Sequence, residues 1–103
     1  SEGLVTRFVG EFRFVGKAET VPIVEVLGRA GQCPPAKVAL ASRFEQAMHA
    51  LEARHFAAAE QAFAAILDDH PDDGPSRFQR ERCRQFSDKP PAGSPWVVNM
   101  ESK

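Results

Sequence analysis

The 103-residue sequence has no long apolar run, almost no net charge and only two cysteines. Its apolar runs are only a few residues long. We therefore expect no membrane-spanning helix, no signal peptide and no membrane partner. The formal net charge of −1 gives no general reason to expect nucleic-acid binding. Cys33 and Cys83 are far apart and form no CxxC pair. We therefore expect two reduced thiols in a cytoplasmic protein, with one disulfide as the alternative.

A β-hairpin is predicted near the front of the chain, from Glu11 to Leu27. Phe12 and Phe14 alternate with polar neighbours, and residues 21–27 form a β-branched run, two patterns typical of strands. The Gly-Lys-Ala-Glu sequence at 16–19 supplies the turn between them.

The hairpin has little sheet around it. Residues 4–9 offer at most one more short strand, and the sequence after Gly28 looks helical. Two strands rarely hold together in water without a third strand or a covering helix. We interpret the hairpin as the end of a larger sheet.

Helices are predicted after a linker over 28–35, which contains two glycines and two prolines. From Ala36 onward, apolar residues recur at the spacing of one buried helix face, namely Phe44, Ala47, Met48 and Leu51. An alanine-rich second helix is predicted over 56–67.

A third helix is predicted over 75–87. The sequence from His70 to Pro75 ends the second helix, and Asp73 or Gly74 is placed to cap the third. Its predicted buried residues are Phe78, Cys83 and Phe86.

The last segment, Trp96 to Met100, is short, apolar and strand-like. Chain ends are normally polar and frayed, so we expect this segment to be buried. We predict that it packs on the hairpin as a third strand. Pro22 makes one edge of the hairpin unsuited to pairing, so the tail should choose the other edge.

The predicted fold class is α+β, with three segments along the chain. Residues 1–28 hold the hairpin, residues 36–88 hold three helices, and residues 89–103 hold a Pro-rich break and the apolar tail. The prediction therefore combines a helical hairpin, a third capping helix and a tail that docks back on the strands.

The helical pair resembles one tetratricopeptide repeat over about residues 43–73. The order small, aromatic, small, aromatic, aliphatic, proline is matched by Ala47, Phe56, Ala59, Phe63, Leu67 and Pro71. Alanines let two antiparallel helices approach closely, while the phenylalanines fill the groove between them. A lone repeat cannot bury both faces, so the third helix is interpreted as a cap.

The hairpin resembles the last two strands of bacterial class III adenylate/guanylate cyclase catalytic domains. The resemblance lies in residues 10–17, with their glycine turn and lysine, and in the run over 21–26. In several bacterial members, a TPR-like extension, a Pro-rich break, an aromatic residue and a Met-x-Ser-Lys ending follow. Here the same order appears as the helical pair, Pro90-Pro91, Trp96 and residues 100–103.

This resemblance implies a parent protein that converts ATP or GTP to a cyclic nucleotide and pyrophosphate. The two metal-binding aspartates of the family, and its asparagine/arginine pair, lie upstream of this segment. The resemblance thus implies Mg²⁺ or Mn²⁺ for the parent, but no cofactor and no catalytic residue in this segment.

Lys17 is the candidate phosphate contact that the resemblance implies. The family places a phosphate-contacting lysine two residues earlier, where this chain has Val15, and Lys17 matches the second lysine of the same turn. A solvated turn lysine is the alternative.

Other polar patterns predict surfaces rather than catalytic sites. Arg77, Arg80 and Arg84 form a basic stripe that, together with Trp96, is the candidate partner-binding surface, with a salt-linked helix face involving Glu81 as the alternative. No spacing predicts a metal site, because His49 and its neighbouring glutamates are typical of a solvated face.

Two functions are compatible with these patterns. The first is a C-terminal regulatory or assembly segment of a class III cyclase, not catalytic by itself, whose partners are the rest of that polypeptide and, through the hairpin, a second copy. The second is a free-standing TPR-type module for protein–protein interaction.

Overall fold

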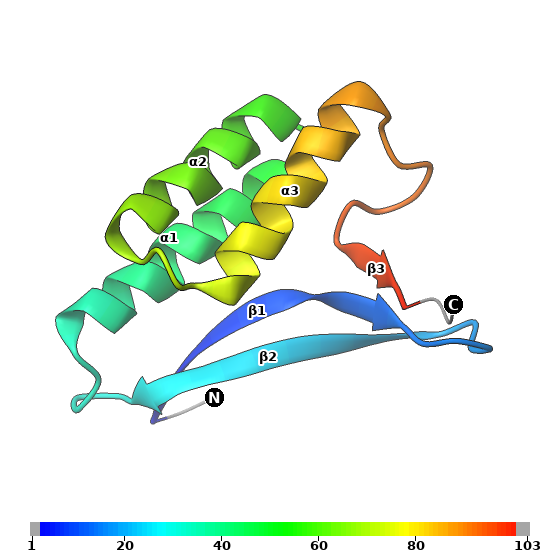
Figure 1. Cartoon of the computed structure of the whole chain (residues 1–103). Helices are drawn as coiled ribbons and strands as arrows, with labels where there is room; N and C mark the ends of the chain where they lie inside the picture. Colours follow the sequence, from blue (N-terminus) through cyan, green and yellow to red (C-terminus); the bar gives the residue numbers. More distant parts are fainter. Residues whose placement is uncertain (1–2, 101–103) are drawn as a thin grey trace.

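The computed structural model describes residues 3–100 as a three-stranded sheet with three helices. The elements in chain order are β1 (Leu4–Arg13), β2 (Thr20–Arg29), α1 (Pro35–Glu52), α2 (Phe56–Asp69), α3 (Gly74–Asp88) and β3 (Val97–Asn99). The helices lie together on one side of the long hairpin, and β3 lies near the hairpin tip (Figure 1). This arrangement confirms the predicted α+β class. No helix within residues 3–100 is long and apolar enough to cross a membrane.

The hairpin is longer than predicted at its front. β1 begins at Leu4 and runs without interruption to Arg13, so the first strand is not limited to the residues after Glu11. The antiparallel register runs from Leu4 opposite Arg29 to Arg13 opposite Thr20. Two bulges interrupt it, and one of them leaves Val9 as an extra residue between Phe8 and Gly10. The bulge breaks the alternation of apolar and polar residues by which a strand is detected in sequence.

Gly10 fits this bulge because it lacks a side chain. Its φ of +140° lies in a region that L-residues with a Cβ rarely adopt. A Cβ here would stand 3.3 Å from both the Trp96 carbonyl oxygen and the Phe12 ring. Gly10 therefore lets the last segment of the chain approach β1 closely.

The C-terminal segment supplies the third strand, as predicted. β3 pairs with β1 in parallel, with Val97 opposite Glu11 and Asn99 opposite Arg13. The sheet order is β2-β1-β3, so the tail avoids the strand that contains Pro22. Residues 101–103 of the predicted ending lie outside the described residues, as do residues 1 and 2.

The predicted apolar faces of α1 and α2 pack together and form most of the helical core. Phe44 and Phe63 meet edge to face with ring centroids 5.3 Å apart. The buried apolar residues of this core are Leu40, Phe44, Ala47, Met48, Leu51, Ala59, Phe63, Ile66 and Cys83. Phe8, Val9 and Trp96 pack against it from the strands and the tail, which joins the hairpin to the helices.

The prediction for α3 was wrong at Phe78, which is 44% exposed. The buried positions of this helix are Ser76, Gln79 and Cys83, while Phe86 is half-buried. Two of the three buried residues are polar, so a hydrophobic pattern points to the wrong face. The predicted cap is confirmed, because the Asp73 carboxylate accepts a hydrogen bond from the Ser76 backbone N–H at 3.2 Å.

The two cysteines are free thiols in different environments. Cys83 is fully buried, and burial raises the pKa of its thiol to about 12. At pH 8 roughly one Cys83 in ten thousand is then a thiolate, the reactive form. Cys33 is half-buried.

A thiol reagent such as Ellman's reagent is therefore expected to modify one thiol per native chain at pH 8, with Cys33 as the target. Two thiols should react in denaturant. The variant Cys33→Ser identifies the reactive position, because its native form should not react. Rapid reaction of two thiols in the native wild type would contradict the buried position of Cys83.

Candidate interaction groove and ion cluster

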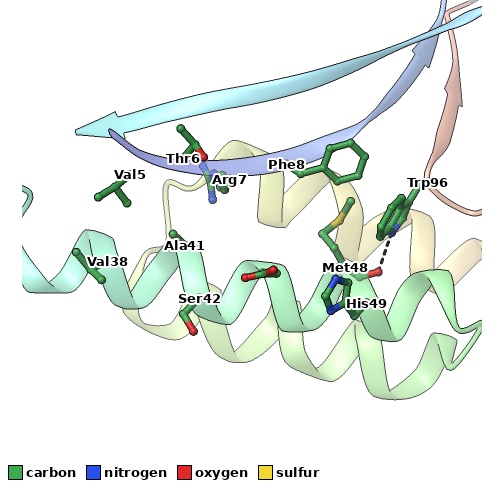
Figure 2. A pocket seen from close by; sticks show the side chains of 11 residues that line it. Val5, Thr6, Arg7, Phe8, Val38, Ala41, Ser42, Met48, His49 and Trp96 are labelled. Carbon is green, nitrogen blue, oxygen red and sulfur yellow. Dashed lines mark hydrogen bonds between the residues drawn. The ribbon is translucent and has the colours of Figure 1, made fainter. Parts of the chain in front are cut away.

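A groove of about 520 Å³ lies between β1 and α1. Figure 2 shows its two walls, with side chains of β1 on one side and those of α1 on the other. It is lined by Val5, Thr6, Arg7, Phe8, Val38, Ala41, Ser42, Glu45, Met48, His49 and Trp96. Its volume falls in the range of ligand-binding pockets, and its lining combines apolar residues with nearly as many polar ones.

Trp96 closes one end of the groove. Its indole N–H donates a 2.7 Å hydrogen bond to the Met48 carbonyl, which is drawn in Figure 2. Its ring packs against Phe8 with centroids 4.7 Å apart and stacks on His49 at 6.3 Å. These contacts join the tail, β1 and the C-terminal half of α1. The side chain proposed from sequence for partner binding thus makes internal contacts and also lines the groove.

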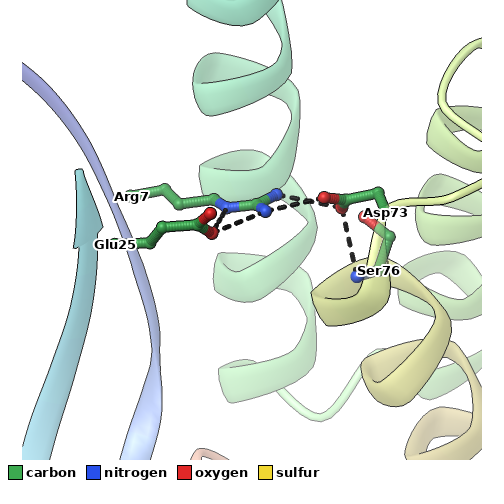
Figure 3. Close-up of polar contacts among 4 residues, drawn as sticks. All are labelled: Arg7, Glu25, Asp73 and Ser76. Carbon is green, nitrogen blue, oxygen red and sulfur yellow. Dashed lines mark hydrogen bonds and ion pairs between the residues drawn. The ribbon is translucent and has the colours of Figure 1, made fainter. Parts of the chain in front are cut away.

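A buried arginine forms part of the β1 wall of the groove. The Arg7 side chain is 2% exposed and extends from β1 toward the helices. It donates to both Asp73 carboxylate oxygens, at 2.9 and 2.6 Å, and to Glu25 of β2 at 2.8 Å (Figure 3). Its guanidinium also lies 4.7 Å from the centre of the Phe44 ring. One side chain therefore connects both long strands with α1 and the start of α3.

The charges of this cluster shift one another's pKa values. Burial by itself would raise the pKa of Asp73, but the hydrogen bonds from Arg7 and Ser76 outweigh it, so the pKa lies below its ordinary value. Burial likewise opposes the charge on Arg7, and the bonds to Asp73 and Glu25 raise its pKa. Both groups are held in their charged forms.

A second buried polar group fixes the bulge and the tail. The Gln79 amide donates to the Val9 carbonyl at 3.1 Å and accepts from Arg82 at 2.9 Å. Arg82 also donates to the Val97 carbonyl at 2.8 Å and lies 4.9 Å from the centre of the Phe86 ring. Burial lowers the pKa of Arg82. Sequence reasoning did not select Gln79 or Arg82, although both lie beside the predicted arginine stripe.

The three predicted stripe arginines have separate surroundings on α3. Arg84 is exposed and pairs with Glu60 and Glu81, as the salt-linked alternative predicts. Arg77 donates to the Pro71 carbonyl. The Nε of Arg80 is buried and has no partner among the described residues. None of the three lines the groove that contains Trp96, so the structure does not bring the predicted partner-binding residues into one site.

Lys17 lies at the hairpin tip and is exposed. It borders a shallow hollow of about 310 Å³ that Arg13 and Asn99 also line. Arg13 donates to the Asn99 side chain at 2.9 Å, so one of the two cations there already has a partner. Within residues 3–100, no three His, Cys, Asp or Glu side chains are placed to hold a metal ion.

Comparisons with protein-family models, curated proteins and solved structures were also made. None of them finds a match to this chain. The function is therefore inferred from the residues and their geometry.

Proposed function

We propose that this chain is the C-terminal regulatory or assembly segment of a class III nucleotide cyclase that acts in the cytoplasm. The observation that carries the proposal is the uncovered state of β2. Its outer edge pairs with no strand among residues 3–100. Four of its apolar side chains are exposed, namely Ile23 by 36%, Val21 by 46%, Val24 by 53% and Val26 by 57%. Exposed apolar side chains on an edge strand are a hazard that proteins normally cover, and because Pro22 disfavours strand pairing at this edge, the cover expected is a further domain packed over these side chains.

The role follows from how the hairpin is attached to the helices. Arg7, Gln79 and Trp96 join β1 and the tail to α1 and α3. If β2 packs on a catalytic domain, the helices are held rigidly against that domain. The segment is then suited to order the domain or its dimer contacts, while the metal-binding aspartates lie upstream.

The first test reads the upstream coding sequence. A cyclase domain with paired metal-binding aspartates, in frame with Ser1, is the expected result. A start codon directly before Ser1 would reject the proposal and favour the free-standing interaction module.

The second test uses the full polypeptide. Purified with Mg²⁺ or Mn²⁺, it should form cyclic AMP or cyclic GMP, whereas residues 1–103 alone should form neither. Ending the polypeptide after Gly28 should lower the activity or the dimer fraction at least severalfold. Unchanged activity and unchanged dimerisation would show that the helices have no such role.

A further inference from the structure

The groove between β1 and α1 runs along the edge of a strand rather than across one face of the sheet. Thr6, Arg7 and Phe8 are consecutive, and no bulge interrupts the strand between them, yet all three line the groove. Successive side chains of a strand point to opposite faces. Arg7 lies over the Phe44 ring and Phe8 packs against the same helical core, so side chains of both faces reach the helices, and the groove beside them lies along the strand edge.

This edge of β1 is open over the length of the groove. β3 pairs only with Glu11 to Arg13, and the Gln79 amide occupies the Val9 carbonyl. From Leu4 to Phe8, the edge opposite β2 pairs with no strand in the described part of the chain. Five residues of strand extend roughly 17 Å, enough for a short extended segment.

The open edge continues one that already accepts a strand. The tail pairs with β1 directly beyond the groove, and the Glu11 backbone N–H donates to the Trp96 carbonyl at 3.0 Å. The opposite wall is a regular helix that presents both apolar and polar side chains to the groove. A strand edge beside a helix is the geometry that binds peptides by strand addition, where main-chain hydrogen bonds supply affinity and side-chain pockets supply specificity.

The polar groups of the groove specify the charge of the ligand. Arg7 is neutralised by Asp73 and Glu25, so it does not present a free cation. Glu45 is exposed on the α1 wall and forms no ion pair among the described residues. The apolar end of the groove lies at Met48, Phe8 and Trp96.

We propose that this groove binds an extended peptide, which adds to the sheet as a strand along Val5 to Phe8. The peptide inserts an apolar side chain against Met48 and Trp96 and places a lysine or arginine opposite Glu45. This inference goes beyond the cyclase assignment, because it concerns a surface that the hairpin and helices form by themselves.

The first experiment selects ligands from a display library of random ten-residue peptides with the whole chain as bait. Enriched peptides should contain alternating apolar residues and a basic residue. Trp96 is the only tryptophan and the chain has no tyrosine, so its fluorescence reports occupation of the groove directly. Failure to enrich any peptide, or binding that leaves the Trp96 emission and the Val5–Phe8 amide resonances unchanged, would overturn the proposal.

Matched variants test the position of the ligand. Ser42→Arg fills the groove from an exposed position on α1 and should weaken binding at least tenfold. Ser87→Arg, the same change at an exposed position of α3 that does not line the groove, should have no effect. Circular dichroism checks that both variants fold. Equal affinities for the two variants would place the peptide elsewhere and reject the proposal.

The charge of the ligand is tested at Glu45. Glu45→Gln should weaken a lysine-containing peptide about fivefold, the size of one surface ion pair, and should not affect its norleucine analogue. Glu19→Gln, in the exposed hairpin turn, is the control. Equal effects of Glu45→Gln on the two peptides would refute the basic specificity.

Backbone pairing is tested on the peptide itself. N-methylation removes one main-chain donor, so methylating alternate residues should abolish binding in one register and spare it in the other. Tolerance of methylation at every position would exclude strand addition. Val5–Phe8 resonances that shift with protein concentration alone would assign the groove to a second copy of the chain and overturn the peptide proposal.

Discussion

Replacing Arg7 with methionine is expected to lower the free energy of unfolding by about 3–5 kcal/mol, as much as truncating a buried core phenylalanine. Methionine retains much of the side-chain volume but leaves the nearly buried Asp73 carboxylate, 9% exposed, without its cation. Urea unfolding at pH 7 measures the loss. Since the free energy of unfolding of small domains is about 5–15 kcal/mol, this loss is a large part of the total stability.

A double variant separates the ion pair from the packing. In Arg7→Met/Asp73→Ser, the carboxylate is gone while serine still caps α3, because its hydroxyl also accepts from the helix N–H groups. Removing both charges from a buried pair costs far less than removing one. The double variant should therefore be more stable than Arg7→Met alone. A single variant as stable as the wild type would show that the cluster contributes nothing.

The same cluster predicts a dependence on pH. The pKa of Asp73 is lower in the folded chain than its ordinary value of 3.8, so the unfolded chain binds its proton first as the pH falls. The stabilisation is complete above that ordinary value and is lost as the pH falls through the folded pKa. Urea midpoints should therefore fall more steeply below about pH 4 in the wild type than in the double variant. Parallel curves would contradict this assignment.

Deleting Trp96 to Lys103 is expected to disorder the hairpin while leaving the helices folded. The deletion removes β3 from β1 and removes the indole packed on Phe8 and hydrogen-bonded to Met48. The expected loss is at least about 3 kcal/mol, the value for truncating a packed tryptophan. Hydrogen exchange should accelerate at Phe12 and Val21, with protection retained in α2. Unchanged protection in the hairpin would contradict this account of the tail.

Trp96→Phe is the matched control in the full chain. Phenylalanine keeps an aromatic ring beside Phe8 but cannot donate to the Met48 carbonyl, so the expected loss is about 1 kcal/mol. Hairpin protection should then remain close to that of the wild type. A Trp96→Phe variant as disordered as the deletion would assign the effect to the one hydrogen bond rather than to the strand.

Much of the fold was predictable because most of its elements follow a local pattern. The α1 face that contains Phe44 and Met48 is apolar at helical spacing, and the β-branched run after Thr20 forms β2 as expected. The docking of the tail could be inferred because the segment from Trp96 to Met100 is apolar and requires cover, and Pro22 excluded one edge.

The polar residues that join the sheet to the helices were not predictable from local patterns. An arginine in a strand usually indicates an exposed position, and Arg7 is buried only because Asp73, 66 residues later, meets it. Gln79 and Ser76 occupy the buried face of α3, where a hydrophobic pattern expects Phe78. Such polar contacts depend on partners that are distant in sequence. The groove was not predicted for the same reason. Its walls come from segments that are distant in sequence and meet only in the folded chain.

The pairing of β3 with β1 has a consequence for how the protein is made. Contacts among the three helices are largely local, and such contacts form quickly. Arg13 and Asn99, in contrast, are 86 residues apart in sequence, yet they are neighbours in the sheet. During synthesis, the β1 edge at Glu11–Arg13 leaves the ribosome before its β3 partner and stays unpaired until Val97–Asn99 has also emerged. The emergence of Val97–Asn99 thus decides when this part of β1 stops being available to other chains.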